Sequence, residues 1–191
     1  MRCIIISLVI LALLTPNLSA VDGVPSPQAK KEAAKGNWPT WRGPNRDGLS
    51  AETGLLSSWQ EREPKLAWKV KDLGNGLSSV AVAEGRIYTM GRRDGATKMS
   101  ALSTKDGAKI WESDMGSEAN EDPNSTPSVD GDRVYGLTHA GQLVCVGTTD
   151  GSILWRKHFP TDFKGKMESG WGYSESSIVA GDNLICTPGG N

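Results

Sequence analysis

The amino-acid sequence predicts an all-β protein, a β-propeller built from four-stranded antiparallel blades. The first observation is a repeat: Ala101–Trp111 (ALSTKDGAKIW) matches Cys145–Trp155 (CVGTTDGSILW) at an offset of 44 residues. A fixed period of this length is typical of repeat architectures. The second observation is that short apolar runs and turn residues divide each period into four short strands, which is the content of one propeller blade.

Three hairpin units show the same order of small hydroxyl residues, an apolar run, a glycine and a second apolar run. They are Ser78–Met90, Ser125–Leu137 and Ser176–Pro188. We expect tight turns at the shared glycine, because glycine adopts a positive φ without steric cost. The three turn glycines are Gly85, Gly131 and Gly181. A second turn follows at the Asp-Gly pairs 106–107 and 150–151, since Asp-Gly is a strong hairpin signal. The inner strands do not alternate cleanly, as expected for strands covered on both faces.

The tryptophan that ends each repeat carries a family resemblance. Ala101, Gly107 and Trp111 resemble the tryptophan-docking repeat of pyrroloquinoline-quinone (PQQ) propellers, A-x-D-x-x-T-G-x-x-x-W, in the quinoprotein alcohol dehydrogenase-like superfamily. The resemblance extends from about residue 66 to the end. It implies that the indole packs between blades with its N–H hydrogen-bonded, since a buried Trp needs an acceptor. Trp68, Trp111 and Trp155 are therefore predicted to be structural.

Within this pattern, several positions differ from the family repeat. Ser103 and Gly147 stand where Asp is usual, and Asp106 and Asp150 stand where Thr is usual. Cys145 replaces the small Ala of the repeat. The fold implied by the resemblance is unaffected, because the turn glycines and the tryptophans are in place.

Residues 1–20 have the composition of a secretory signal peptide. Arg2 gives a positive start, Cys3–Leu14 is an apolar run, and Ser19-Ala20 offers a small-residue cleavage site. The apolar run is too short to span a bilayer, which takes ~20 residues. We expect export to the periplasm or the extracellular space, with soluble release, followed by a flexible linker over residues 21–37.

Residues 38–65 form a tryptophan-rich lead-in with Trp38, Trp41 and Trp59 among turn residues. They are either an aromatic platform for a ligand or a strap that packs on the edge of the propeller or completes its last blade. The strap is favoured, because aromatic side chains more often pack than recognise ligands. The run WRGPNRDG (41–48) resembles the N-terminal signature of secreted PQQ-like propeller proteins of bacteria and supports the strap.

Residues 66–191 are assigned to blades: the first over Leu66–Met115, the second over Ser125–Phe159, and the first half of a third. A propeller ring takes ~4–8 blades. The ring is therefore expected to be incomplete, as in a fragment, with completion by oligomerisation as the second explanation. The long connection Lys157–Tyr173 is the expected contact region, because inserts between propeller strands gather on one face.

No catalytic or metal-binding residue is predicted, and cofactor-binding residues stay open. Glu118, Glu121 and Asp122 lack the spacing of an EF-hand, so a solvated acidic connector is favoured over a Ca²⁺ loop. His139 and His158 lie outside any nucleophile motif or metal spacing. After signal cleavage the cysteines are Cys145 and Cys186, and two free thiols are favoured over a disulfide.

Two functions follow from these observations. The first is a non-catalytic propeller that binds a protein or another envelope component, as implied by the outer-membrane assembly factors of the BamB type within the family. The alternative is a PQQ-dependent alcohol dehydrogenase, for which the resemblance implies a quinone in the central funnel, a Ca²⁺ ion and an Asp base. The formal charge of −1 gives no case for binding nucleic acid or an anionic membrane surface.

Overall fold

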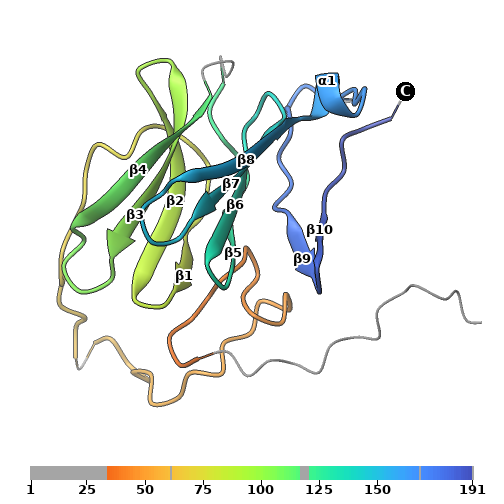
Figure 1. Cartoon of the computed structure of the whole chain (residues 1–191). Helices are drawn as coiled ribbons and strands as arrows, with labels where there is room; N and C mark the ends of the chain where they lie inside the picture. The colour runs from red at the N-terminus through yellow and green to blue at the C-terminus, as the bar shows by residue number, and fades with distance from the viewer. Residues whose placement is uncertain (1–33, 61, 117–120, 168, 191) are drawn as a thin grey trace, which may run out of the picture.

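Two four-stranded antiparallel sheets and a two-stranded sheet stand next to one another in the computed structural model (Figure 1). The structure describes residues 34–60, 62–116, 121–167 and 169–190. The first sheet contains β1 (Ala81–Ala83), β2 (Arg86–Arg93), β3 (Ala96–Ser103) and β4 (Lys109–Gly116). The second contains β5 (Ser128–Asp130), β6 (Arg133–Leu137), β7 (Gln142–Gly147) and β8 (Ile153–His158), followed by a helical turn α1 (Phe159–Asp162). The third pairs β9 (Ile178–Ala180) with β10 (Asn183–Ile185).

This architecture confirms the predicted four-stranded antiparallel blades and their incomplete number. The expected turn glycines have positive φ values, 73° at Gly85, 56° at Gly131 and 58° at Gly181. One boundary differs from the expectation, because the first sheet begins at Ala81 and not at Leu66. Trp68 lies in a coil segment before this sheet.

Some predicted segments lie wholly or partly outside the described residues. These are the signal peptide (1–20) and all but the last residues of the linker (21–37). Among the residues that the structure describes, no helix is both long and apolar enough to cross a membrane.

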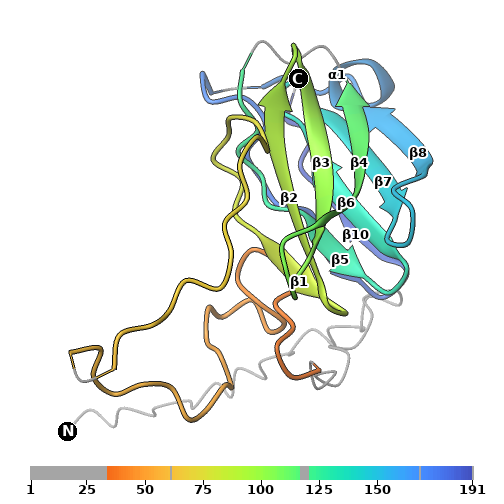
Figure 2. The same cartoon turned by 90° about the vertical axis from the view of Figure 1, so that its left-hand side faces the viewer.

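The first strands of the three sheets lie innermost. β1 contacts β5, and β5 contacts β9, whereas the outer strands β4 and β8 lie farther apart (Figures 1 and 2). The sheets thus fan out from a common side, as blades do around a propeller axis. We call this side the axial side.

A hydrophobic core fills the space between the first two sheets. It joins Tyr88 of β2 and Met99 of β3 to Val134 of β6 and Val144 of β7, with further residues of both sheets. In β6, all residues after Arg133 are buried, and so is the middle of β7, which confirms the expectation of strands covered on both faces. The same expectation was wrong for β10, where Asn183 and Ile185 are exposed. Each Å² of apolar surface that such packing removes from water contributes ~25 cal/mol to the free energy of folding, and this is the main source of stability.

A second, smaller cluster fixes the long connection after β8. Phe159 of α1 meets Tyr173 edge-on, with ring centroids 5.1 Å apart and planes at 83°. Both rings pack with Leu137 and Leu143 of the second sheet. The connection Lys157–Tyr173 is therefore anchored at both ends to the same sheet.

The N-terminal strap lies along the axial side. Trp38 exchanges two backbone hydrogen bonds with Val82 of β1, at 2.7 and 2.9 Å. The amide of Val129 on β5 donates to the carbonyl of Pro39 at 2.9 Å, and the guanidinium of Arg46 donates to the carbonyl of Val179 on β9. The strap therefore contacts the innermost strand of each of the three sheets, where an outer edge or a last blade was the expectation.

The run WRGPNRDG folds into a compact loop within the strap. Gly43 has a φ of 80°, and a β-carbon there would lie 2.8 Å from the Trp38 ring, so only glycine fits. The Thr40 hydroxyl donates to the Gly43 carbonyl at 2.6 Å, and the Gly48 amide donates to the Arg42 carbonyl at 3.0 Å. Trp38 is thus a packing residue, whereas Trp41, the first residue of the run, is 62% exposed.

Two carboxylates on β4 make stability depend on acid pH. A hydrogen bond from Lys98 at 2.7 Å lowers the pKa of Asp114. Burial of the Glu112 carboxyl opposes its ionisation, but hydrogen bonds from Lys109 and Arg93 outweigh this and lower its pKa. Because the folded pKa values lie below the unfolded ones, the contribution is complete above about pH 4.5 and is lost as pH falls through the folded values.

We therefore expect the urea midpoint of unfolding to fall as the pH drops below about 4.5. The control is Glu112→Gln, which cannot ionise and should lose part of this pH dependence. An equally steep decline in the variant would contradict the role of Glu112.

Candidate functional site

Three segments lead into the innermost strands and lie side by side at one end of the axial side. We call residues 72–79, 121–127 and 169–177, which precede β1, β5 and β9, the axial segments. The Leu77 amide donates to the Pro123 carbonyl at 2.9 Å, which joins the first segment to the second. The Asn124 side-chain amide donates to the Trp171 carbonyl and to the Ser174 hydroxyl, both at 3.1 Å, which joins the second to the third.

Serine and threonine residues at the end of each axial segment make further hydrogen bonds to the neighbouring blade. The Ser79 amide donates to the Thr126 hydroxyl at 3.2 Å, and the Thr126 amide donates to the Ser176 hydroxyl at 2.9 Å. The Ser128 hydroxyl donates to the Ser177 carbonyl at 2.6 Å. The sequence pattern identified these hydroxyl residues in each unit, but their bonding to the neighbouring blade appears only in the structure.

Trp171 stands out on the third axial segment. Its indole is 73% exposed, yet its backbone is held by Asn124, by the Ser174 hydroxyl at 3.2 Å and by the Ser169 hydroxyl at 3.4 Å. The next residue, Gly172, has a φ of 65°, and a β-carbon there would lie 2.3 Å from Nε2 of His139. The loop is therefore fixed while its large aromatic side chain faces solvent.

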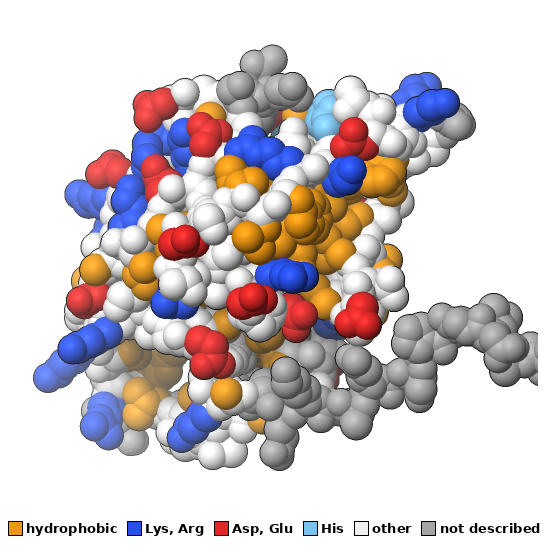
Figure 3. Space-filling model, in the orientation of Figure 1, with side chains coloured by type: hydrophobic (Ala, Val, Ile, Leu, Met, Phe, Trp, Pro, Cys, Tyr) orange, Lys and Arg blue, Asp and Glu red, His pale blue; other side chains and the backbone are white. Residues whose placement is uncertain are grey.

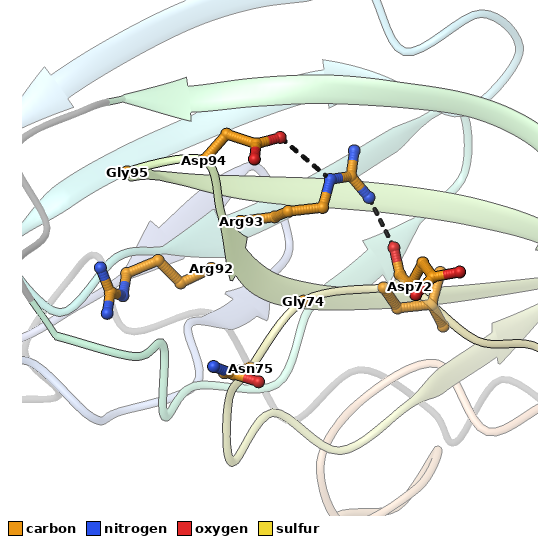
Figure 4. A pocket seen from close by; sticks show the side chains of 8 residues that line it. Asp72, Gly74, Asn75, Arg92, Arg93, Asp94 and Gly95 are labelled. Carbon is orange, nitrogen blue, oxygen red and sulfur yellow. Dashed lines mark hydrogen bonds and ion pairs between the residues drawn. The ribbon is translucent and has the colours of Figure 1, made fainter.

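A pocket of about 460 Å³ lies beside the first axial segment, between residues 72–75 and 92–95 (Figure 4). Arg93 donates to the Asp72 carbonyl at 2.5 Å and pairs with Asp94 at 3.4 Å and with Glu112. The hydrogen bond with Glu112 is the main cause of the raised pKa of Arg93. Figure 4 shows Arg92 directed away from these groups, and its Nε pairs with Asp122 at 3.1 Å. The charged groups of the pocket thus pair with one another. These contacts hold the first axial segment against the β2–β3 hairpin, and we interpret the pocket as structural.

The residues weighed for metal binding and catalysis do not converge. Glu118 lies outside the described residues, and Asp122 is paired with Arg92. The His139 ring packs against Gly172. Nδ1 of His158 lies 3.2 Å from the hydroxyl of Thr161 in α1. Within the described ranges, no three His, Cys, Asp or Glu side chains gather as a metal site.

The two cysteines of the described residues, Cys145 and Cys186, are separate free thiols. Burial on β7 raises the pKa of Cys145 to about 11, and burial also raises the pKa of Cys186, which is less enclosed. A thiol reacts as its thiolate. We expect iodoacetamide at pH 8 to leave Cys145 unmodified in the folded protein and to alkylate it in urea, as read by peptide mass. Rapid alkylation of Cys145 without urea would contradict its burial.

The docking tryptophans behave as expected in two of three positions. Nε1 of Trp111 donates to the Thr148 carbonyl at 2.9 Å, and Nε1 of Trp68 donates to the Thr104 carbonyl at 3.2 Å. Each ring covers the Asp-Gly turn of the sheet that follows it, so Trp68 docks on the first sheet and Trp111 on the second.

Trp155 has a different environment. It packs against Tyr135 with centroids 6.0 Å apart and remains 36% exposed. No Asp-Gly turn follows Trp155 in the described part of the chain. Figure 3 shows hydrophobic side chains gathered on the face that holds β8 and the β9–β10 hairpin, and Ile153 and Leu154 are also exposed there.

The blades, the docked tryptophans and the converging first strands define a PQQ-like β-propeller repeat protein. Residues 48–191 match the family described as outer membrane protein assembly factor BamB, and the chain belongs to this family. A search of curated proteins gave no significant match.

Three solved structures resemble part of the chain. BamB from Moraxella catarrhalis is 17% identical with a TM-score of 0.42, over 59% of this chain and 30% of that chain. Quinohemoprotein alcohol dehydrogenase ADHIIG from Pseudomonas putida HK5 is 23% identical with a TM-score of 0.49, over 63% and 18%. Quinohemoprotein alcohol dehydrogenase from Comamonas testosteroni is 16% identical with a TM-score of 0.46, over 61% of this chain and 18% of that chain. The chain thus spans less than a third of the length of these proteins.

The axial segments provide a test of fit for the PQQ and Ca²⁺ that the resemblance implies. They offer mainly hydroxyl, amide and backbone groups, whereas Ca²⁺ takes 6–8 oxygen ligands with several carboxylates. The carboxylates of Asp122 and Glu175 are engaged with Arg92 and with the Thr187 amide. No three His, Cys, Asp or Glu side chains of the described residues gather there, so the described axial segments do not present the cluster of carboxylates that a calcium site of this kind uses.

Proposed function

We propose that the protein is an exported propeller that acts as a non-catalytic binding and assembly scaffold in the cell envelope. The observation that carries this proposal is the character of the axial segments. Their polar groups are tied between blades, and their large exposed side chains are the apolar Leu77 and Trp171. A rigid surface that presents exposed apolar side chains is suited to binding a partner.

Membership of the family described as outer membrane protein assembly factor BamB supports this function. Catalysis by a quinone would need a positioned acid or base beside the cofactor, and two carboxylates of the axial segments, Asp122 and Glu175, contact other groups of the chain. The partner is a protein or another envelope component. The formal charge of −1 supports neither nucleic acid nor an anionic surface as the partner.

Export rests on the sequence of residues 1–20, with their positive start, apolar run and small-residue cleavage site. The mature chain would then begin near Val21 and reside in the periplasm or outside the cell. An intact mass that corresponds to this start would support export, and a retained Met1 would contradict it.

The alternative function is a PQQ-dependent alcohol dehydrogenase. Its support is the docking motif, realised by Trp68 and Trp111, which resembles the repeat of that superfamily. In this case PQQ and Ca²⁺ would be held by parts of a ring other than the described blades.

Two measurements on protein from its native source separate these functions. The first is quinone absorbance and alcohol-dependent dye reduction after addition of PQQ and Ca²⁺. The second is cross-linking in intact cells from a photo-reactive amino acid at Leu77, with the exposed β3–β4 turn residue Lys105 as the control position. We expect no quinone-dependent reduction and one discrete adduct from position 77 alone. Bound quinone with alcohol-dependent turnover would overturn the scaffold function.

A further inference from the structure

Resting on the proposed scaffold function, we propose that Trp171 and the small polar residues around it bind a carbohydrate by stacking. The site is the exposed end of the third axial segment, and the ligand is a hexopyranose ring of a glycan chain. This specifies one ligand class for a surface that the proposed function leaves general.

The first argument is preorganisation. The Trp171 backbone is held by hydrogen bonds to Asn124, Ser169 and Ser174, and the loop is pressed on His139 through Gly172. The Tyr173 amide adds a hydrogen bond to the His139 carbonyl at 3.0 Å. A ligand that stacks on this indole orders little additional chain, so little entropy opposes binding.

The second argument is the shape of the surroundings. The indole is 73% exposed, and its chain neighbours are Gly170 and Gly172. A β-carbon added at Gly170 would have no heavy atom within 4 Å, so the space beside the loop is open. A flat ring can therefore approach the indole without displacing a bulky neighbour.

The third argument is chemical. The C–H face of a pyranose ring is apolar and slightly positive, and it matches the negative face of an indole. Ser169, Ser174 and Asn124 border the loop, and although the Asn124 NH₂ group donates within the chain, the side-chain oxygens of these residues can still accept hydrogen bonds from sugar hydroxyls. A site with one aromatic face and a hydroxyl and amide border suits a sugar.

Other ligand classes fit this site less well. A protein hot spot usually lies in a well-packed apolar centre, whereas the residues that hold Trp171 are small and polar. Single-stranded nucleic acid needs a basic groove along its phosphates, and the chain has a formal charge of −1. The exposed Trp41 differs, because the Arg42 guanidinium lies 5.9 Å from its ring. It therefore serves as a matched control.

The test titrates the full chain with chitotetraose and, in parallel, with cellotetraose, and follows tryptophan fluorescence and ligand saturation-transfer NMR. We expect saturable binding of at least one of these oligosaccharides. Trp171→Ala should weaken it by about tenfold or more, as loss of one stacking platform does. Trp171→Phe should lie in between, and Gly170→Val should weaken binding by filling the open space. Trp41→Ala should bind as the unmodified protein does.

Circular dichroism and the urea midpoint check that each variant folds, and the exposed position of Trp171 predicts no change in either. Absence of saturable binding to both oligosaccharides, or equal affinity in Trp171→Ala, would overturn the inference. An envelope protein cross-linked to Leu77 without glycan binding would remove the inference and keep the scaffold function. Glycan binding together with quinone-dependent turnover would keep the inference and remove the scaffold function.

Discussion

Replacement of Trp111 by alanine is expected to lower the free energy of unfolding by about 3–5 kcal/mol, as truncation of large core aromatics does. The indole is 7% exposed and packs on the Asp-Gly turn of the second sheet. Its Nε1 donates to the Thr148 carbonyl at 2.9 Å. The substitution thus opens a cavity between two blades and leaves a carbonyl without its donor, so the transfer and hydrogen-bond losses add.

Urea unfolding followed by circular dichroism measures this loss. Trp111→Phe keeps an aromatic ring and removes the N–H, so a smaller loss of about 1–2 kcal/mol is expected. Trp155→Ala is the matched control, because this indole is 36% exposed and covers no turn in the described chain. A loss under about 1 kcal/mol for Trp111→Ala would contradict the docking role, since buried aromatic truncations cost more.

The parts of the fold that the sequence predicted are those with local causes. A positive φ at Gly85 or Gly131 is required by a two-residue turn, and such a turn has a residue signature. The repeat offset between Trp111 and Trp155 likewise follows from the number of residues in four short strands. Periodicity therefore predicted the blades and their order along the chain.

Contacts between repeats were harder to predict, because the sequence does not show which turn each tryptophan covers. Trp68 docks on the Asp-Gly turn of the first sheet, so it occupies the position that an outer strand of a preceding blade would hold. The first blade was expected from Leu66 and so included this residue, whereas Trp68 lies in the coil before the sheet, which begins at Ala81.

The position of the strap also could not be predicted from the sequence. Trp38 is held to Val82 by backbone hydrogen bonds, which any residue can make and which leave no pattern. The hydroxyl residues before each inner strand were visible, but their partners lie in the next blade. For Trp171 the signal was the run Gly-Trp-Gly-Tyr at 170–173, in which only glycine fits at position 172 because the His139 ring packs against it.

Gly151→Ala is expected to destabilise the protein, because Gly151 is the residue of the Asp-Gly turn on which the Trp111 ring packs. A β-carbon there would lie 2.7 Å from Cδ2 of Trp111 and 2.6 Å from the Ser113 hydroxyl, and the φ of 72° is unfavourable for alanine. Overpacking of this kind costs about 1–3 kcal/mol, and the positive φ adds about 1–2 kcal/mol.

Gly95→Ala separates these two costs, because Gly95 has a nearly equal φ of 75° and open space around its β-carbon. The difference between the two variants in urea unfolding measures the steric part alone. In a Trp111→Ala background the clash with the ring is removed but the contact with the Ser113 hydroxyl remains, so Gly151→Ala should cost less than in the unmodified protein and still more than Gly95→Ala. Additive effects of Trp111→Ala and Gly151→Ala would show that the two residues do not interact, because residues in contact couple and distant ones do not. Non-additivity would instead establish the turn and the indole as one docking unit that holds adjacent blades together.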